Sequence, residues 1–181
     1  LDEKSEINVI ANGLPASPGA ASGKVVFTSE EAERLNDMMQ DTILVRVETS
    51  PEDIQGMHAA KGILTARGGM TSHAAVVARG MGRPCVSGSS EIDINYERKI
   101  FKTSEIEIKE GEIITIDGST GRIMQGKVPT VKPEISGDFS KLMSWADSIR
   151  KLKVRTNSET PVDTKIARDF GAEGIGLCRT E

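Results

Sequence analysis

The sequence predicts an α/β fold in which short strands, helices and tight turns alternate along the chain. Apolar runs rich in Val and Ile recur through residues 1–126 and are separated by glycine-rich turns. Ser or Thr followed by Pro or acidic residues, a common start of a helix, lies between several of these runs. Residues 152–181 then read strand, helix, strand with short connections, which is typical of a parallel sheet or barrel.

The composition excludes two functional classes. Of the 181 residues, 37% are apolar and 28% are charged, a balance typical of globular proteins. Lys and Arg number 23 against 27 Asp and Glu, so the net charge is −4, which argues against a general nucleic-acid-binding protein. No apolar run approaches the roughly 18–20 residues that cross a bilayer. We therefore expect no nucleic-acid partner and no membrane span.

The cysteines and the chain ends indicate the cellular setting. Cys85 and Cys178 are far apart in the sequence and belong to no C-x-x-C pair, so neither a zinc site nor a disulfide framework is indicated. Reduced thiols are typical of a cytoplasmic protein. The chain starts at Leu1 without a basic and apolar leader, and it stops within an apolar run. We expect a cytoplasmic protein and a piece of a longer chain.

Strands and helices are expected to alternate through the first part of the chain. Ser29, which two glutamates follow, predicts one helix start. Ser50, which Pro and two acidic residues follow, predicts another, and that helix should end near Gly62. The neighbouring strands are predicted by the apolar runs Val25–Phe27, Ile43–Val47 and Ile63–Ala66.

Two tight turns are expected further along. The runs Ile106–Ile108 and Ile113–Ile116 flank Glu110 and Gly111 and resemble the arms of a β-hairpin. A second turn is predicted at residues 117–119, where Asp, Gly and Ser follow one another.

Residues 127–151 are predicted to be a linker. Two prolines favour an extended piece at its start, and an amphipathic helix should run from about Phe139 to Leu152. Leu142, Trp145 and Ile149 recur there at helical spacing, which indicates ordinary packing on a neighbour.

Residues 152–181 are predicted to begin a second domain. Strands at Leu152–Arg155 and Ile175–Cys178 should flank a helix that Thr160 caps. One such strand–helix–strand unit cannot cover both faces of its strands, so it should be part of a larger sheet or barrel.

The segment 65–82 holds the densest cluster of chemically informative residues. It runs from a strand through a loop with Gly68 and Gly69 into a short helix. The glycines let the backbone turn sharply and approach a ligand. Thr71 and Ser72 offer hydroxyl groups at the helix start, where backbone N–H groups lack partners and attract anions. The pattern indicates a phosphate-binding loop.

His73 follows in the first turn of that helix. The positive end of the helix dipole disfavours an imidazolium, so the ring should stay neutral with one nitrogen lone pair free. Such a nitrogen is a covalent nucleophile, and the helix start stabilises the negative charge of an attached phosphoryl group. The pattern therefore favours a phosphohistidine over a general base, while spacing alone leaves a capping role open.

Other charged residues near the loop are weaker candidates. Arg67 lies on the loop itself and is the favoured phosphate clamp, and Arg79 and Arg83 could serve in the same way. His58 lies in the preceding helix without a glycine-rich loop or neighbouring hydroxyl groups, so we expect no function for it.

The stretch from Gly68 to Gly88 resembles the phosphohistidine signature of the PEP-utilising enzymes. Residues 15–23, 47–53 and 117–121 are similar to the same family, so the resemblance covers nearly the whole chain. Within the family, the chain looks like the members that convert ATP, phosphate and pyruvate into AMP, diphosphate and PEP. PEP synthase and the sugar-phosphotransferase enzyme I share the double glycine and the histidine but usually have Arg where Met70 stands.

The resemblance implies a fold and site roles. Residues 1–126 would be a swivelling β/β/α phosphohistidine domain, residues 127–151 a linker, and residues 152–181 the truncated start of a PEP/pyruvate-binding TIM barrel. His73 would carry the phosphoryl group on the loop formed by Arg67, Gly68, Gly69 and Ser72. By the family pattern, Arg179 would contact the substrate, and Thr71 would be an inhibitory phosphorylation site for a regulatory kinase/phosphorylase.

The resemblance also implies partners and a cofactor. An ATP-grasp domain and the barrel of the same protein would exchange phosphoryl groups with His73, with ATP, phosphate and pyruvate or PEP as substrates. Mg²⁺ would be held by residues outside this chain, the whole enzyme would be a homodimer, and this chain alone would be inactive. Two alternatives stay open: the carrier domain of PEP synthase, in which water takes the γ-phosphoryl group, and a non-catalytic mobile module that only binds an anion.

Overall fold

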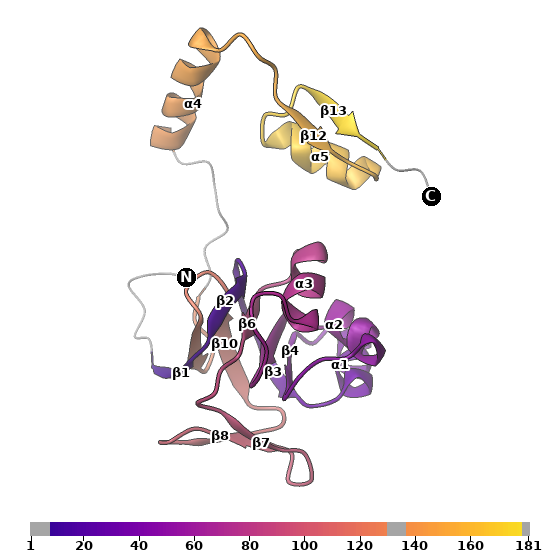
Figure 1. The fold of residues 1–181 in the computed structure, drawn as a ribbon, viewed down its shortest axis with the longest axis vertical. Helices are drawn as coiled ribbons and strands as arrows, with labels where there is room; N and C mark the ends of the chain where they lie inside the picture. Colours follow the sequence, from indigo (N-terminus) through magenta and orange to yellow (C-terminus); the bar gives the residue numbers. More distant parts are fainter. Residues whose placement is uncertain (1–7, 130–136, 179–181) are drawn as a thin grey trace. The chain divides into compact units, whose positions relative to one another are not determined.

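The computed structural model describes residues 8–129 and 137–178, which form two compact units (Figure 1). The units span residues 1–131 and 132–181 and are described separately. Both contain strands and helices, so the predicted α/β class is confirmed. None of the described helices is both long and apolar enough to cross a membrane.

An eight-stranded mixed sheet forms the centre of the first unit. Its order is β1-β11-β10-β3-β4-β5-β6-β2. Four neighbouring strands run parallel to one another: β3 (Ala20–Val26), β4 (Thr42–Arg46), β5 (Gly62–Thr65) and β6 (Cys85–Ser87). The strands outside these four pair antiparallel: β1 (Val9–Asn12), β11 (Arg122–Gln125), β10 (Ile113–Asp117) and β2 (Leu14–Ser17).

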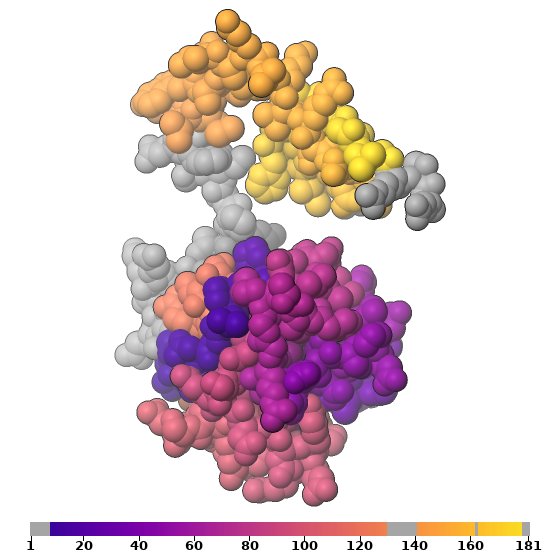
Figure 2. Space-filling model, viewed as in Figure 1, coloured from indigo at the N-terminus to yellow at the C-terminus, as the bar shows by residue number. Residues whose placement is uncertain are grey.

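The two faces of this sheet are covered differently. Three helices, α1 (Ser29–Asp37), α2 (Ile54–Ala59) and α3 (His73–Gly80), pack on one face. The other face packs against a small antiparallel sheet of β7 (Asp93–Asn95), β8 (Ile100–Lys102) and β9 (Glu107–Lys109). Successive side chains of a strand point to opposite faces, so Val26 and Leu44 face the helices while Val25 and Val45 face the small sheet. Figure 2 shows the surface of this unit from the same side as Figure 1.

The predicted hairpin around Glu110 and Gly111 is wrong. β9 pairs with β8 in the small sheet, whereas β10 pairs with β3 and β11 in the large one. The turn therefore carries the chain from one layer to the other, with Gly111 at φ +86° and its N–H bonded to Val25. The second predicted turn is confirmed, since β10 and β11 form a hairpin across residues 118–121.

One helix cap and one helix end differ from the predictions. α1 begins at Ser29 as predicted, but Thr28 caps it, because its hydroxyl accepts a hydrogen bond from Glu31 N at 3.2 Å. The helix after Ser50 opens with a 3₁₀ turn, η1 (Pro51–Asp53), and α2 ends at Ala59 instead of near Gly62. Gly62 starts β5, where a Cβ atom would lie 2.8 Å from Ile116 Cδ1.

The second unit contains α4 (Gly137–Ile149) and a strand–helix–strand segment. The segment consists of β12 (Arg155–Asn157), α5 (Pro161–Asp169) and β13 (Gly174–Leu177), and its two strands pair parallel as predicted. Thr160 caps α5 as predicted: its hydroxyl accepts from Asp163 N at 3.1 Å, and the Asp163 carboxylate accepts from Thr160 N at 3.2 Å. The first strand begins at Arg155 and not at Leu152.

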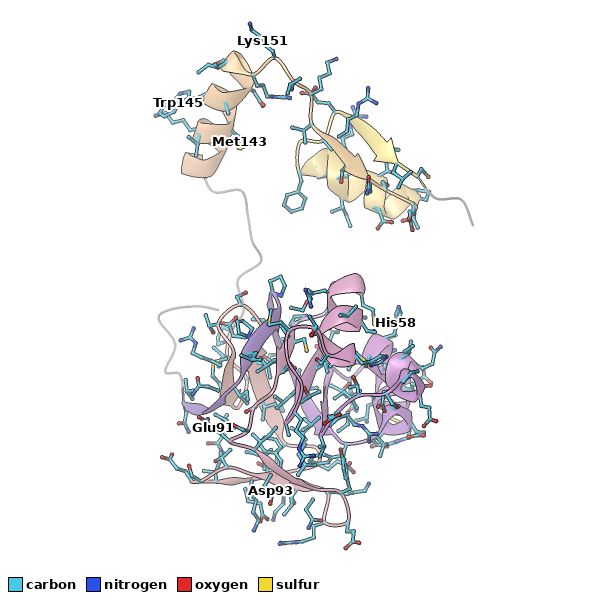
Figure 3. The ribbon with its side chains drawn as sticks, viewed as in Figure 1. His58, Glu91, Asp93, Met143, Trp145 and Lys151 are labelled. Atoms are coloured by element: carbon cyan, nitrogen blue, oxygen red, sulfur yellow. The ribbon has the colours of Figure 1, made fainter. Side chains whose placement is uncertain are left out.

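The predicted amphipathic helix is α4. Trp145 on α4 is 58% exposed (Figure 3). The Nζ atom of Lys141 lies 5.6 Å from the centroid of its ring. Leu142 and Ile149 are also exposed. The packing of this apolar stripe on a neighbour stays a prediction.

Candidate functional site

His73 is the first residue of α3, at the edge of the sheet. Ser72 precedes it in an extended conformation and caps the helix, since its hydroxyl accepts a hydrogen bond from Ala75 N at 3.3 Å. Ala74, Ala75 and Ala78 are buried, and their small side chains let α3 lie close to the strands beneath. The His73 ring is half-buried, so one side of it faces outward.

Thr49 lies beside the imidazole ring. Its Oγ1 is 2.9 Å from His73 Nδ1; Thr49 lies in the loop that follows β4, and His73 starts the helix that follows β5. Since β4 and β5 run parallel, their carboxyl ends meet at one edge of the sheet, and the Val47 carbonyl accepts a hydrogen bond from Arg67 N at 2.9 Å. In the described part of the chain, Nε2 of the ring has no hydrogen-bond partner. Nδ1 is therefore bonded to Thr49, whereas Nε2 is open.

Buried hydroxyl groups support the loop from below. Ser87, which is fully buried, donates to the Gly68 carbonyl at 3.0 Å and lies 3.4 Å from the Ser72 hydroxyl. Thr65 donates to the Arg67 carbonyl at 2.8 Å. The carbonyl groups of the loop are thus bonded from the inner side.

Backbone N–H groups of the loop remain available to a ligand. Among the described residues, the N–H groups of Gly69, Met70 and Thr71 have no acceptor. They lie next to the positive end of the α3 dipole, as does His73 N at the first helical position. Free donors at a helix start favour the binding of an anion such as phosphate.

The two glycines of the loop differ in their surroundings. Gly68 has φ +108°, and a Cβ atom there would lie 2.9 Å from the Cβ of Ser72. Gly88 approaches from below, so that a Cβ on it would lie 2.4 Å from the Gly68 carbonyl oxygen. Gly69 has nothing within 4 Å of a built Cβ. Close packing therefore requires glycine at Gly68, whereas Gly69 borders open space.

The three arginines near the loop have different partners. Arg79 Nη2 donates to the Met70 carbonyl and its Nε donates to the Ala75 carbonyl at 3.0 Å, so this guanidinium braces the loop. Arg83 donates to the His58 carbonyl at 2.8 Å and ties the end of α2 to the loop after α3. Arg67 is exposed, and its guanidinium has no partner among the described residues. Arg67 is therefore the cation best placed to meet an anion.

The remaining predicted residues have simpler environments. Thr71 is exposed on the loop. His58 is exposed near the end of α2 and contributes only its carbonyl to a contact (Figure 3). Arg179 lies outside the described residues. Within residues 8–129 and 137–178, no group of three or more His, Cys, Asp or Glu side chains could hold a metal ion.

Sequence patterns indicate no role for Thr49, Ser87 or Thr65, although all three contact the site. Thr49 lies in residues 47–53, which resemble the family, but the resemblance gave it no function. Its position after a predicted strand could have placed Thr49 near the His73 loop, because loops that follow adjacent parallel strands meet at the same end of the sheet. Ser87 and Thr65 are single hydroxyl groups within apolar strands, and only the packing reveals that they face the loop.

Comparison with known proteins identifies the family. Residues 38–121 match the model of the PEP-utilising enzyme mobile domain, and residues 133–181 match that of the PEP-utilising enzyme PEP-binding domain. The chain belongs to the PEP-utilising enzymes, as the resemblance at the His73 loop predicted.

Several curated relatives of this chain are pyruvate, phosphate dikinases. The chain is 58% identical over its whole length to a pyruvate, phosphate dikinase of Rhizobium meliloti, of which it covers 20%. It is 61% identical over 96% of its length to that of Clostridium symbiosum, again covering 20%, and 60% identical to a chloroplastic one of Oryza sativa, covering 18%. The chain thus spans about a fifth of the length of these curated relatives. Among solved structures, an NMR structure of Enzyme I aligns with a TM-score of 0.36 and 21% identity over 62% of this chain and 40% of that one.

Proposed function

We propose that this chain is the phosphate-carrier part of a pyruvate, phosphate dikinase, with His73 as the residue that is phosphorylated. The observation that carries the proposal is the state of the imidazole ring: Thr49 holds Nδ1 at 2.9 Å while Nε2 is open beside a helix start. The identity to dikinases over nearly the whole chain supports the same assignment.

Nε2 is the nucleophile in this proposal. Nδ1 keeps its proton and donates a hydrogen bond to Thr49 Oγ1, which leaves the lone pair on Nε2. Nε2 attacks the β-phosphorus of ATP; an N–P bond forms, and the P–O bond to AMP breaks with its electron pair on the departing oxygen. The γ-phosphoryl group passes to inorganic phosphate, giving diphosphate, and the β-phosphoryl group stays on His73.

The second half-reaction returns the electron pair to the ring. A base of the barrel, outside this chain, would take a proton from the methyl group of pyruvate to give the enolate. The enolate oxygen attacks phosphorus, the N–P bond breaks, its electron pair goes back to Nε2, and PEP leaves. The overall sum is ATP, phosphate and pyruvate to AMP, diphosphate and PEP.

The loop stabilises the phosphoryl group between the two steps. The free N–H groups of Gly69, Met70 and Thr71 and the dipole of α3 meet its oxygens, and the Arg67 guanidinium reaches them from the open side. Gly68 lets the loop pass over Ser72 without a clash. The site therefore supports covalent storage of the group better than proton transfer.

The proposal extends to the rest of the enzyme. Residues 1–126 would swivel as a β/β/α carrier on the linker 127–151 between an ATP-grasp domain and a PEP/pyruvate barrel that begins at 152–181. Arg179 would contact the substrate in that barrel. When bound, Mg²⁺ would neutralise charge on the phosphates, and residues outside this chain would hold it. The whole enzyme would be a cytoplasmic homodimer, and this chain alone would be inactive.

Thr71 would be a regulatory phosphorylation site. It is exposed two residues before His73, so a regulatory kinase/phosphorylase could reach it. A phosphate on Thr71 adds about two negative charges beside the nucleophile and repels an incoming phosphoryl group. Thr71→Glu should lower His73 phosphorylation, and Thr71→Val should not.

The test uses a full-length enzyme that contains this chain. The protein is incubated with Mg²⁺ and β-labelled ATP without pyruvate, with or without phosphate, and the label is mapped; His73→Asn is the control. Acid-labile label on His73, with diphosphate released only when phosphate is added, supports the dikinase. The same label with inorganic phosphate released in place of diphosphate, and with no need for added phosphate, indicates PEP synthase, against which Met70 argues. A folded protein with no label on His73 leaves only the anion-binding module.

A further inference from the structure

Two anchors hold the loop that carries Thr49, and neither belongs to the phosphate-binding loop. The first anchor is Tyr96, which follows β7 in the small sheet (Figure 1). Its hydroxyl accepts a hydrogen bond from Val47 N at 2.8 Å. The ring packs edge-on against Phe27, with centroids 6.4 Å apart, and the Arg46 guanidinium carbon lies 5.4 Å from its centroid.

The second anchor is Asp53, which is only 4% exposed. Its Oδ2 accepts from Ser50 N at 2.9 Å, and its Oδ1 accepts from the Ser29 hydroxyl at 2.9 Å. Arg46 Nη2 lies 3.4 Å from Oδ1, and Arg46 Nη1 donates to the Phe27 carbonyl at 3.0 Å. A buried carboxylate with a charged partner and two further donors is held in one position.

The anchors fix the backbone on both sides of Thr49. Tyr96 bonds the N–H group two residues before it, and Asp53 bonds the N–H group directly after it. A shift of Thr49 away from the ring would break one of these bonds. Arg46 connects the anchors, because it contacts both the Asp53 carboxylate and the Tyr96 ring.

We propose that Tyr96 and the Arg46–Asp53 pair are positioning residues for His73: they hold Thr49 against Nδ1 and thereby keep the lone pair on Nε2. The inference rests on the proposed function, in which Nε2 is the nucleophile. Because Tyr96 links the small sheet to the Thr49 loop, the small sheet would help to orient the His73 ring. None of the three side chains touches the reacting atoms.

Tyr96→Phe is the sharpest test. It keeps the ring against Phe27 and Arg46 and removes only the hydroxyl, and since Tyr96 is 41% exposed, no cavity is created. Glu97→Gln, on an exposed neighbour, is the matched control. Arg46→Lys is the second variant, since it keeps the charge but loses the fork that reaches both Phe27 and Asp53.

The first readout is the pair of ring ¹⁵N shifts of His73 in the 181-residue chain, at a pH where the ring is neutral. The exposed His58, the one other histidine, is the internal reference. The wild-type chain and Glu97→Gln should show a ring protonated on Nδ1. Tyr96→Phe and Arg46→Lys should show a mixture of tautomers, with His58 and the amide spectrum outside the loop unchanged. Phosphorylation of His73 in the full-length enzyme should slow by about 3- to 10-fold in both variants.

Thr49→Val separates the two proposals. If Thr49→Val changes the His73 tautomer and rate while Tyr96→Phe and Arg46→Lys change neither, the positioning role is wrong and the proposed function stands. If Thr49→Val itself leaves both readouts as in the wild type, the nitrogen assignment fails and the positioning role fails with it. Slow phosphorylation with a wild-type tautomer in Tyr96→Phe would also overturn the inference.

Discussion

Thr49 Oγ1 lies 2.9 Å from His73 Nδ1, although the two residues are 24 positions apart in the chain. The contact depends on β4 and β5, whose parallel pairing brings their following loops together at one sheet edge. It divides the roles of the ring nitrogens, because Nδ1 is bonded to the protein and Nε2 is open to a substrate.

Removing the Thr49 hydroxyl should slow phosphorylation of His73. Thr49→Val keeps the shape of the side chain and loses the hydrogen bond to Nδ1, so the ring can turn and change its tautomer. One hydrogen bond contributes about 0.5–1.5 kcal/mol, which predicts a rate about 3- to 10-fold lower. The measurement is the initial rate of acid-labile labelling in the full-length enzyme. Thr49→Ser keeps a hydroxyl and should label at nearly the wild-type rate; equal losses in both variants would contradict this role.

Gly68 and Gly69 should respond differently to alanine. Gly68→Ala places a methyl group 2.9 Å from Ser72 Cβ at a backbone φ of +108°, so it should lower the free energy of unfolding by about 1–3 kcal/mol and slow the labelling of His73. Gly69→Ala meets nothing within 4 Å and should change the unfolding free energy by less than about 0.5 kcal/mol. Chemical denaturation of the two variants compares them directly. Similar losses at both positions would mean that the loop is not packed as described.

Asp117 should contribute stability that disappears in acid. Burial alone would raise its pKa, but hydrogen bonds from Thr120 and Ser119, together with the Arg122 guanidinium, outweigh this effect, so the pKa lies below its usual range. The folded state therefore favours the carboxylate. This contribution is fully present above the unfolded-state pKa of about 3.9 and is lost as the pH falls through the lower folded-state pKa.

Asp117→Asn should thus destabilise the protein by about 1–3 kcal/mol at pH 7 and by clearly less near pH 3. The measurement is urea denaturation of both proteins across that range. Asp41→Asn is the control, since Asp41 is exposed and, among the described residues, its carboxylate meets only Lys61, at 3.6 Å. Its effect should stay within about 0.5 kcal/mol. A loss at Asp117 that is independent of pH would show that the carboxylate charge is not what stabilises the turn.

The two thiols should differ in reactivity. Burial raises the pKa of the Cys85 thiol to about 12, and its side chain is inaccessible, whereas Cys178 is exposed. A thiol reagent at pH 8 should therefore titrate one cysteine in the native chain and two after denaturation. Cys178→Ser should leave no fast-reacting thiol in the native chain. Rapid reaction of Cys85 in that variant would mean that β6 opens readily.

Local signals in the sequence predicted much of the site region. The start of α3 follows from Ser72 as a cap and from the small residues after it, and the Thr160 cap and the turn at residues 117–119 were found in the same way. Each of these features depends on residues within a few positions of one another. Such features can be read from one stretch of sequence.

Features that depend on distant pairing were missed. The strands on either side of Gly111 were expected to pair with each other, but their alternating Ile residues suit any partner, and packing assigns them to different sheets. Thr49 reaches His73 only through the pairing of β4 with β5, and Ser87 reaches Gly68 only through β6. Arg79 was a candidate phosphate clamp, but the structure turns it back on the loop.

The ring nitrogen of His73 that carries the phosphoryl group can be identified directly. A full-length enzyme that contains this chain is labelled from β-labelled ATP with Mg²⁺ and phosphate, hydrolysed in alkali, and its phosphohistidine isomers are separated. We expect the isomer phosphorylated on Nε2 at His73, because Thr49 occupies Nδ1. Label on Nδ1, or on a residue other than His73, would contradict it.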